Sequence, residues 1–383
     1  MKFIRLLIVP FALVFVCVVR LIKPWVLVRF GDLYTNRLGH LIGNIESYLC
    51  EMDAGLQAKA FDIWIPADRQ ICSKFVFGKY KSVLHVMPGW FGTMVVKVNG
   101  LFRGWEKHIV APANNDRDIH NLWEKHAPHF GFTRREERKG QRLLRKLGVP
   151  EGAKWVCLSI RDSAYLKAKL PAADWSYHDY RDSDVATCMP AVIELISRGY
   201  YVVRVGDVVE KPFHLKHSHV IDYPFNKYKS DFGHVYLGAK CAFVLGSSSG
   251  FMTICQAFNR PVGVINYVPL EYMLTYSRGL IIWKHHIKNG RRMTFDEIVA
   301  GGFGLCTFGH VFAQNGVTLE ENSAQEIYEL AKEMADYAEG KTIPEDQARF
   351  WNAFPRSTCT MFGTPLHGKI VMRVGTKFLE GYQ

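Results

Sequence analysis

The feature that most constrains the fold is a regular alternation of apolar, strand-like runs and helical patterns in the second half of the chain. Strand-like runs occur at 154–162 ("KWVCLSIRD"), 200–207 ("YYVVRVGD"), 242–246 ("AFVLG") and 261–269 ("PVGVINYVP"), with helical patterns between most of them. Strand and helix in alternation is typical of a parallel, doubly wound sheet covered by helices on both faces. The sequence therefore predicts an α/β domain over residues 150–345.

Residues suited to binding an anion follow several of these strands. The carboxyl ends of parallel strands face one crevice, so residues that are far apart in sequence should meet there. Serine hydroxyls and amides at a helix amino terminus bind phosphate, and a glycine permits close backbone approach, although serines also cap helices for structural reasons alone. The predicted phosphate-binding set is Arg161, Arg204, Gly206, Ser247, Ser248, Ser249 and Gly250.

The segment 165–184 ("YLKAKLPAADWSYHDYRDSD") is rich in Tyr, Trp, His and charged residues, and it directly follows the first of these strands. Aromatic rings stack on sugars and nucleobases, so the segment could shape a pocket beside the phosphate site, with Tyr180 and Arg181 as candidate binding residues. A loop that packs its aromatic residues inward has the same composition. Because its D-x-D sequence runs directly into a helix, Asp184 is equally well explained as an N-cap, and we expect no essential metal.

The first half of the chain predicts a second domain of the same kind. The strand-like "WVLVRF" (25–30) is followed by a glycine-containing loop and the helical pattern "IESYLCEMDAGL" (45–56). Strand, glycine loop and helix are typical of the opening of a Rossmann-like domain. We expect that domain over residues 24–149, with a boundary near Pro150, and a tail over 346–383 that packs back on it.

The amino end carries an apolar run, 6–19, flanked by Lys2 and Arg5 before it and by Arg20 and Lys23 after it. This run is shorter than the ~20 residues that span a bilayer, and no cleavage site follows it. An interfacial or re-entrant anchor, a short tilted span and a core helix all remain open. The membrane interpretations are favoured because a hydrophobic segment with basic flanks has few neighbours to bury it. We therefore expect a hydrophobic, membrane-associating helix over residues 1–23.

The net charge of +12, from 48 Lys and Arg against 36 Asp and Glu, suits nucleotide phosphates, an anionic membrane surface or nucleic acid. Nucleic acid is not expected as a partner, because no aromatic residues are interleaved with the basic run 134–146. The nine cysteines are scattered and contain no C-x-x-C pair, which argues against a disulfide framework or a zinc site and fits a reducing cytoplasm.

Several motifs resemble, in the same order, a family of bacterial glycosyltransferases encoded among surface-polysaccharide genes. They are "RFGDLYTNRLGHLIGNIESYLCEMD", "SIRDSAYL", "DWSYHDYRDSDV", "RGYYVVRVG", "YKSDFGHVYLGAKCAFVLGSSSGF" and "RPVGVINYVPL", and they cover most of residues 26–270. More distantly, a strand ending in Arg with a later Ser-Ser-Gly turn is similar to GT-B fucosyltransferases, in which that Arg contacts the donor diphosphate. The resemblance implies GT-B architecture, in which two Rossmann-like domains face a cleft.

The resemblance also implies a reaction, the transfer of a sugar from a nucleotide-sugar donor to a surface-polysaccharide or other glycan acceptor, lipid-linked or free. It would occur at the cytoplasmic face of the inner membrane, with no cofactor beyond the nucleotide-sugar co-substrate. The alternative is a catalytically inactive nucleotide-binding scaffold of a polysaccharide assembly complex. An isotopically traced donor-hydrolysis assay separates the two.

The chemistry needs charge stabilisation and a base. Arg side chains and helix amino-terminal amides can stabilise the departing diphosphate without a metal. In an inverting mechanism the acceptor hydroxyl also loses a proton to His, Asp or Glu. His40 is the first candidate base, because the loop after the first strand should face the cleft, unless it is a capped core histidine. Glu46 is the second candidate, and Asp162 is the third if donor and acceptor both sit on the second domain.

Overall fold

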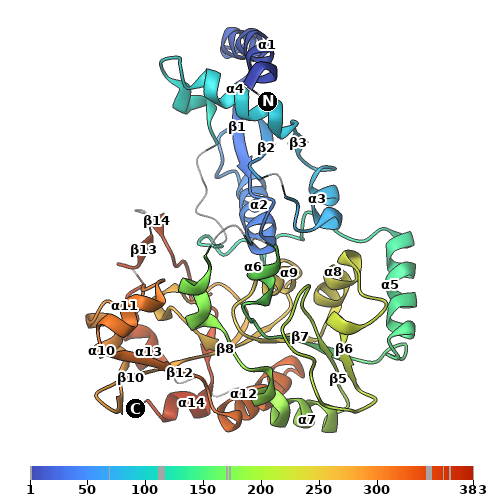
Figure 1. The fold of residues 1–383 in the computed structure, drawn as a ribbon, viewed down its shortest axis with the longest axis vertical. Helices are drawn as coiled ribbons and strands as arrows, with labels where there is room; N and C mark the ends of the chain where they lie inside the picture. Colours follow the sequence, from blue (N-terminus) through green and yellow to red (C-terminus); the bar gives the residue numbers. More distant parts are fainter. Residues whose placement is uncertain are drawn as a thin grey trace. The chain divides into compact units, whose positions relative to one another are not determined.

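The computed structural model describes residues 2–68, 70–110, 117–169, 171, 174–341, 347–356, 358–361 and 364–382 (Figure 1). The chain divides into two compact units, here called unit 1 (residues 1–118 and 122–131) and unit 2 (residues 119–121 and 132–383). The sequence predicted the boundary near residue 150, whereas residues 132–149 lie in unit 2. The predicted tail also belongs to unit 2, where strand β15 (Arg373–Val374) pairs in parallel with β9 (Gly279–Trp283).

Unit 1 is built on a three-stranded parallel sheet in the order β1-β2-β3. Val28 to Leu33 of β1 lie opposite Phe61 to Pro66 of β2, residue by residue. The elements of unit 1 are α1 (Lys2–Leu21), β1 (Val28–Leu33), α2 (Leu38–Asp53), β2 (Phe61–Pro66), α3 (Lys74–Tyr80), β3 (His85–Val86), α4 (Gly89–Asn99) and η1 (Trp105–His108). Strand, loop and helix therefore open this unit as predicted, with β1 followed by α2.

Helix α1 packs one face into the core of unit 1. Ala12 and Val16 have no exposed surface and Val19 is buried, and the three belong to one apolar cluster with Phe30 of β1 and Val95 of α4. The spacing of four and then three residues places these side chains on one side of the helix. Among the residues that the structure describes, no helix has both the length and the apolar character needed to cross a membrane.

Unit 2 contains a seven-stranded parallel sheet in the order β15-β9-β8-β7-β4-β5-β6. The chain runs outward through β4, β5 and β6, then returns to β7 beside β4 and runs outward the other way. This confirms the predicted parallel, doubly wound sheet. The strands of this sheet are β4 (Trp155–Ser159), β5 (Tyr201–Arg204), β6 (Val220–Asp222), β7 (Phe243–Gly246), β8 (Val262–Tyr267), β9 and β15. A smaller sheet is formed by β10 (His285–Lys288), β11 (Arg291–Arg292) and β12 (Val317–Glu320), and another by β13 (Thr360–Met361) and β14 (Thr364–Pro365).

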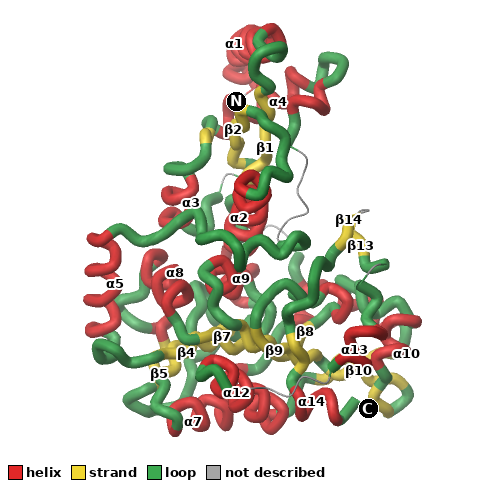
Figure 2. Tube along the Cα trace, turned by 180° about the vertical axis from the view of Figure 1, so that it is seen from behind, coloured by secondary structure: helices red, strands yellow, loops and turns green. Residues whose placement is uncertain are grey.

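Helices cover both faces of the large sheet (Figure 2). On one side, helix α12 (Ala324–Ala338) packs on β7, β8 and β9 and against α7 (Met189–Ser197). On the other, α9 (Gly250–Ala257) packs on β7 and β8 and against α8 (Asp231–Lys240). Capping boxes at Thr294 and Ser323 begin α10 and α12. The helices of unit 2 are α5 (Arg134–Lys146), α6 (Ala164–Lys169), η2 (Ser176–Arg181), η3 (Val185–Cys188), α7 (Met189–Ser197), η4 (Tyr223–Phe225), α8 (Asp231–Lys240), α9 (Gly250–Ala257), η5 (Leu270–Tyr272), α10 (Phe295–Ala300), α11 (Gly309–Gln314), α12 (Ala324–Ala338), α13 (Ala348–Ala353) and α14 (Thr376–Glu380).

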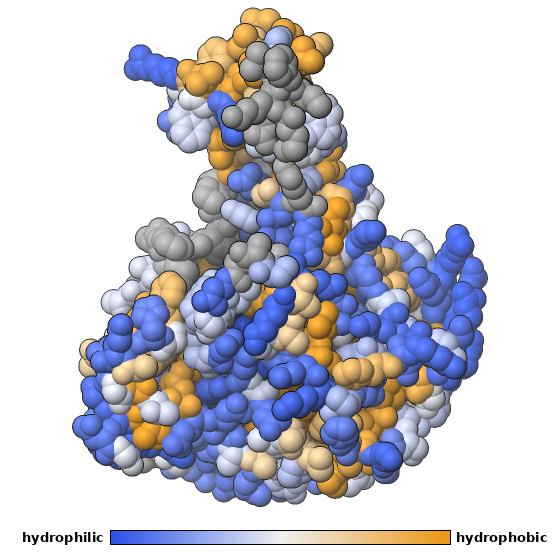
Figure 3. All heavy atoms as spheres, viewed as in Figure 1, coloured by the Kyte–Doolittle hydropathy of each residue, from blue (hydrophilic) through white to orange (hydrophobic). Residues whose placement is uncertain are grey.

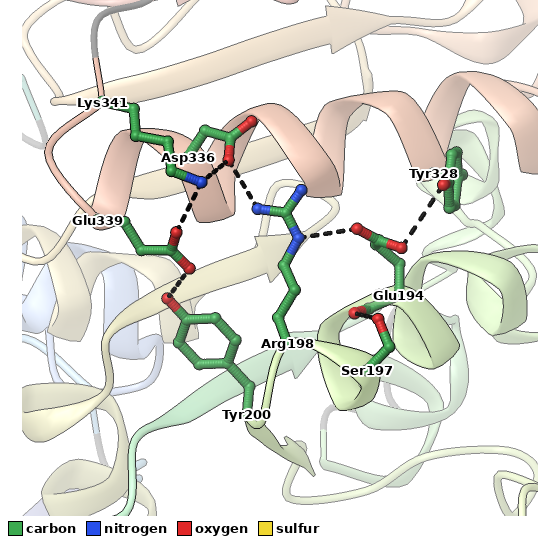
Figure 4. Close-up of polar contacts among 8 residues, drawn as sticks. All are labelled: Glu194, Ser197, Arg198, Tyr200, Tyr328, Asp336, Glu339 and Lys341. Atoms are coloured by element: carbon green, nitrogen blue, oxygen red, sulfur yellow. Dashed lines mark hydrogen bonds and ion pairs between the residues drawn. The ribbon is translucent and has the colours of Figure 1, made fainter.

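Charged side chains tie α7 to α12 (Figure 4). Arg198, just after α7, donates from Nε to Glu194 Oε1 and from Nη1 to Asp336 Oδ1, both at 2.7 Å. Lys341 Nζ also lies 2.7 Å from Asp336 Oδ1 and 3.0 Å from Glu339 Oε2. Because Arg198 is held between two carboxylates, this ion-pair network fixes the two helices that cover one face of the sheet.

Candidate functional site

The candidate site lies in unit 2 where the strand order reverses, between the carboxyl ends of β4 and β7. The Arg161 N–H donates to Ser247 Oγ at 2.7 Å, and the Ser247 N–H donates to the Ser159 carbonyl at 3.0 Å. A Cβ on Gly246 would lie 1.9 Å from the Ser159 carbonyl oxygen, so only glycine permits this close approach. The reversal point of a doubly wound sheet is where such folds bind ligands.

Helix α9 begins directly after the serine run. Ser249 is the N-cap residue, but its side chain makes no capping hydrogen bond. Its Oγ lies instead 2.9 Å from Ser159 Oγ, so the serine links the two strand ends. The first N–H groups of a helix have no intrahelical acceptor and carry partial positive charge, which favours an anion. The predicted structural alternative, in which the serine caps the helix, therefore does not describe Ser249.

Two arginines lie beside this serine run, one contacting it through its side chain and the other through its backbone N–H. Arg181 Nη2 donates to Ser248 Oγ at 3.1 Å, and Arg161 Nη1 donates to the His178 carbonyl at 3.1 Å and forms an ion pair with Asp182. The pKa of Arg161 is lowered, first by burial and then by the nearby charge of Arg181. Arg181 Nε is buried and has no hydrogen-bond partner among the described residues. Two guanidinium groups held together in this way favour a bound anion.

Sequence reasoning missed Lys284, which directly follows β9. Its Nζ donates to the Asp182 carbonyl at 2.7 Å and lies 3.7 Å from Glu321 Oε1, and burial lowers its pKa. The pKa of Asp182 is raised to about 6, mainly by burial, which outweighs the opposing charge of Arg161. A lysine immediately after the apolar run "GLIIW" was the available signal. Lys284 is thus a third cationic side chain near the two arginines.

The other residues predicted in unit 2 have internal partners. Arg204 is buried, donates to the Lys211 carbonyl and lies 3.4 Å from Asp222 Oδ1, so its side chain links β5 to β6. The Gly206 carbonyl lies 2.9 Å from His234 Nε2. Tyr180 packs against Phe312 of α11, with ring centroids 5.8 Å apart, and burial raises its pKa to about 12.

Two predicted acidic residues accept backbone hydrogen bonds. Asp162 accepts from the Ala164 N–H at 3.0 Å and from the Glu210 N–H at 2.9 Å, so both of its carboxylate oxygens are engaged. Asp184 is the N-cap of η3 and accepts from the Ala186 N–H at 2.9 Å, as the sequence indicated. Both side chains therefore stabilise loops at this end of the sheet.

The two candidate bases of unit 1 lie in different environments on α2. His40 lies in the first turn and is half-buried, its ring centroid is 6.3 Å from that of Tyr34, and its side chain makes no hydrogen bond to a described residue. Glu46 is buried, accepting from Tyr80 OH at 2.9 Å on one oxygen and from the His129 N–H at 3.2 Å on the other. Glu46 therefore has the environment of a structural carboxylate.

The described residues contain one group with metal-ligating atoms close together, formed by Glu46, Cys50 and His129, whose ligand atoms lie within 4.8 Å of one another. His129 already bridges two carboxylates, since Nδ1 lies 2.9 Å from Glu46 Oε2 and Nε2 lies 3.1 Å from Asp53 Oδ2. Burial and then the charge of Glu46 raise the pKa of Cys50 to about 12, which opposes thiolate formation. The hydrogen bonds thus account for the cluster without an ion.

No protein-family model and no curated protein sequence matches the chain. Solved structures similar to it include a family 9 glycosyl transferase from Veillonella parvula, with a TM-score of 0.47 and 11% identity over 81% of this chain and 97% of that one. The ADP-heptose lipopolysaccharide heptosyltransferase II of E. coli has a TM-score of 0.35 and 13% identity over 61% and 83%. The iron-containing dodecameric glycosyltransferase TibC of enterotoxigenic E. coli has a TM-score of 0.35 and 11% identity over 70% and 64%.

Proposed function

We propose that the chain is a glycosyltransferase of the GT-B type whose unit 2 binds the diphosphate of a nucleotide-sugar donor at residues 246–250. The observation that carries the proposal is the contact of the Arg161 N–H with Ser247 and of the Arg181 side chain with Ser248, where the strand order reverses. Cations and helix amino-terminal N–H groups at that point suit a dense negative charge. The sequence resemblance to bacterial surface-polysaccharide glycosyltransferases supports sugar transfer as the reaction.

In the proposed reaction an acceptor hydroxyl attacks the anomeric carbon of the donor sugar, and the bond from that carbon to the diphosphate breaks. The leaving diphosphate keeps the electron pair, and Arg161, Arg181 and Lys284 balance the charge that develops, so no metal is required. His40 of unit 1 takes the proton of the hydroxyl. The acceptor is a glycan, free or lipid-linked, at the cytoplasmic face of the inner membrane.

Donor binding is tested by calorimetric titration with the diphosphates of uridine, guanosine, adenosine, cytidine and thymidine. At least one should bind, and Arg181→Ala should weaken it by about 1.5–3 kcal/mol because a charge-assisted contact is lost. Arg291→Ala is the matched control, since this exposed arginine pairs with Glu297 away from the strand ends. Equal diphosphate affinities of the Arg181→Ala variant and the wild type would contradict the proposed binding site.

Turnover separates an enzyme from a binding scaffold. The nucleotide-sugar of the base that binds, carrying a label in the sugar, should lose that sugar slowly to water and faster to a glycan acceptor. Activity should persist in a chelator, as expected of charge stabilisation by side chains. Tight diphosphate binding with no release of labelled sugar from any donor of that base would favour the catalytically inactive scaffold.

A further inference from the structure

The side of α1 that faces away from the core carries a continuous row of exposed apolar residues. Leu7, Phe11, Val14, Val18 and Leu21 are all exposed, Phe11 and Leu21 at 72% each. Their spacing of four, three, four and three residues places them in one line along the helix, and this line is called the apolar stripe below. A surface helix of a soluble protein normally carries polar residues there.

Neighbouring segments extend this surface. Trp25, just past the end of α1, is 79% exposed, and Leu101, just past α4, is 82% exposed. Trp90 in the first turn of α4 is exposed as well, and α4 is the helix against which α1 packs. Figure 3 shows hydrophobic residues gathered on the surface around α1. Exposed apolar surface of this extent indicates an interaction site, and tryptophan is the residue type most enriched at membrane interfaces.

The charge around the apolar stripe is positive. The first 26 residues contain Lys2, Arg5, Arg20 and Lys23 and no Asp or Glu. Arg20 is fixed in place, since Nη1 donates to the Arg103 carbonyl at 3.1 Å and Nη2 donates to Asn99 Oδ1 at 3.0 Å. Lys23 and Arg103 are exposed at the same end of the helix. Apolar side chains flanked by cations match a bilayer surface that contains anionic lipids.

We propose that α1 lies in the plane of an anionic lipid surface, with the apolar stripe among the headgroups and its opposite face in the core of unit 1. The buried face decides the orientation, because Ala12 and Val16 are fully enclosed by protein and lipid therefore reaches only the other side. A second copy of the chain fits less well, since a two-fold contact through the apolar stripe would bring like cations together. This inference is independent of the proposed sugar transfer.

The test uses the full chain and vesicle flotation. Wild-type protein should float with phosphatidylcholine vesicles that contain about 30% phosphatidylglycerol and bind vesicles of phosphatidylcholine alone more weakly. Phe11→Ser with Leu21→Ser should weaken the partition onto anionic vesicles about tenfold. Leu56→Ser with Ile193→Ser is the matched control, because both residues are exposed apolar side chains that do not belong to the apolar stripe and should leave binding unchanged.

A second pair of variants tests the charge. Lys23→Glu with Arg103→Glu should weaken binding to anionic vesicles about tenfold and leave binding to neutral vesicles nearly unchanged. If the serine variant loses its wild-type circular dichroism spectrum, Val14→Asn with Val18→Asn replaces it. Vesicle binding that survives both the apolar and the charge substitutions would overturn the proposal. So would a wild-type dimer that the serine substitutions convert to monomer while vesicle binding is absent.

Depth of insertion completes the test. Trp25 and Trp90 should shift their fluorescence to shorter wavelength when anionic vesicles are added, and Trp25→Phe with Trp90→Phe should remove most of that shift. Lipids brominated near the headgroup should quench this fluorescence more strongly than lipids brominated near the bilayer centre. Stronger quenching from the bilayer centre would contradict a helix that lies on the surface.

Discussion

The Arg161 N–H and the Ser247 side-chain oxygen lie 2.7 Å apart, and their hydrogen bond joins the ends of two neighbouring strands that are 86 residues apart in sequence. The bond does two things at once. It satisfies a backbone donor where β4 ends, and it fixes the backbone from which the Arg161 side chain extends to the His178 carbonyl and Asp182. Under the proposed function, stability and donor binding are coupled at this position.

Ser247→Ala should lower the free energy of unfolding by about 1–3 kcal/mol, because it leaves a partly buried N–H without an acceptor. Urea denaturation followed by circular dichroism measures the change. Ser248→Ala is the matched control for stability, since its hydroxyl is half-buried and accepts from the Arg181 side chain rather than from the backbone. That variant should weaken diphosphate binding and stay within ~0.5 kcal/mol of wild-type stability. Indistinguishable denaturation curves for the Ser247→Ala variant and the wild type would contradict the stabilising role of the Ser247 hydroxyl.

Asp182 should make unit 2 less stable as pH rises through the weakly acidic range. Burial raises its pKa to about 6, whereas in the unfolded chain it titrates near 3.9. Between these values the unfolded state is ionised while the folded state still holds the proton, so stability is full below about pH 4 and falls up to about pH 6. The unfolding free energy of the wild type minus that of the Asp182→Asn variant should decline by up to about 3 kcal/mol between about pH 4 and about pH 6. A difference that does not change with pH would refute the raised pKa.

His129 should make unit 1 less stable at alkaline pH. Burial lowers the pKa of the imidazole, but the hydrogen bonds and charges of Glu46 and Asp53 outweigh burial and raise it. A raised pKa for a base gives stability that is present below the unfolded value of about 6.5 and is lost as pH rises through the folded value. Thermal melting from pH 6 to pH 9 should show this loss in the wild type and a smaller one in His129→Gln.

Glu46→Gln should destabilise unit 1 by about 1.5–3 kcal/mol. The carboxylate now accepts hydrogen bonds from His129, and the NH₂ group of glutamine cannot accept them. Turnover per folded molecule should stay near the wild-type value, since the carboxylate has the environment of a structural group. A large loss of turnover without a loss of stability would restore Glu46 as a candidate base.

His40→Ala should slow the chemical step by a factor on the order of 10²–10⁴ with little change in donor affinity, because a base acts on the acceptor hydroxyl and not on the diphosphate. It should also remove one ionisation from the pH dependence of turnover. Single-turnover kinetics with a labelled donor measure the step. Equal losses in donor binding and turnover would instead assign His40 a positioning role.

The alternating pattern predicted much of unit 2 correctly. Runs such as 155–158 are apolar throughout because parallel strands are buried on both faces, and local helical signals separate them. The meeting of Arg161 with Ser247 followed from one rule, that the ends of parallel strands share an edge.

Pairings between distant residues were beyond the sequence pattern. Arg204 was predicted to bind phosphate because it ends a strand, but nothing local shows that Asp222 lies 3.4 Å from it. The buried pair of Arg29 and Asp62, with a 2.7 Å contact between neighbouring strands, left no signal either. Helix α5, which precedes the predicted boundary near residue 150, belongs to unit 2. It is basic and polar overall, and its contact with α8 passes through Gly140, where a Cβ would lie 2.1 Å from the Tyr236 ring.

Helix α12 leaves the ribosome after every central strand that it covers. Strands β7, β8 and β9 are complete by Trp283, yet the helix that packs on them ends at Ala338. Its Asp336 forms the ion pair with Arg198 and also pairs with Lys341. A nascent chain therefore carries an uncovered apolar sheet face for some 55 residues of synthesis. Chains arrested in that interval should recruit chaperones, and cotranslational burial of the sheet should be complete only after the Arg198 pairs close.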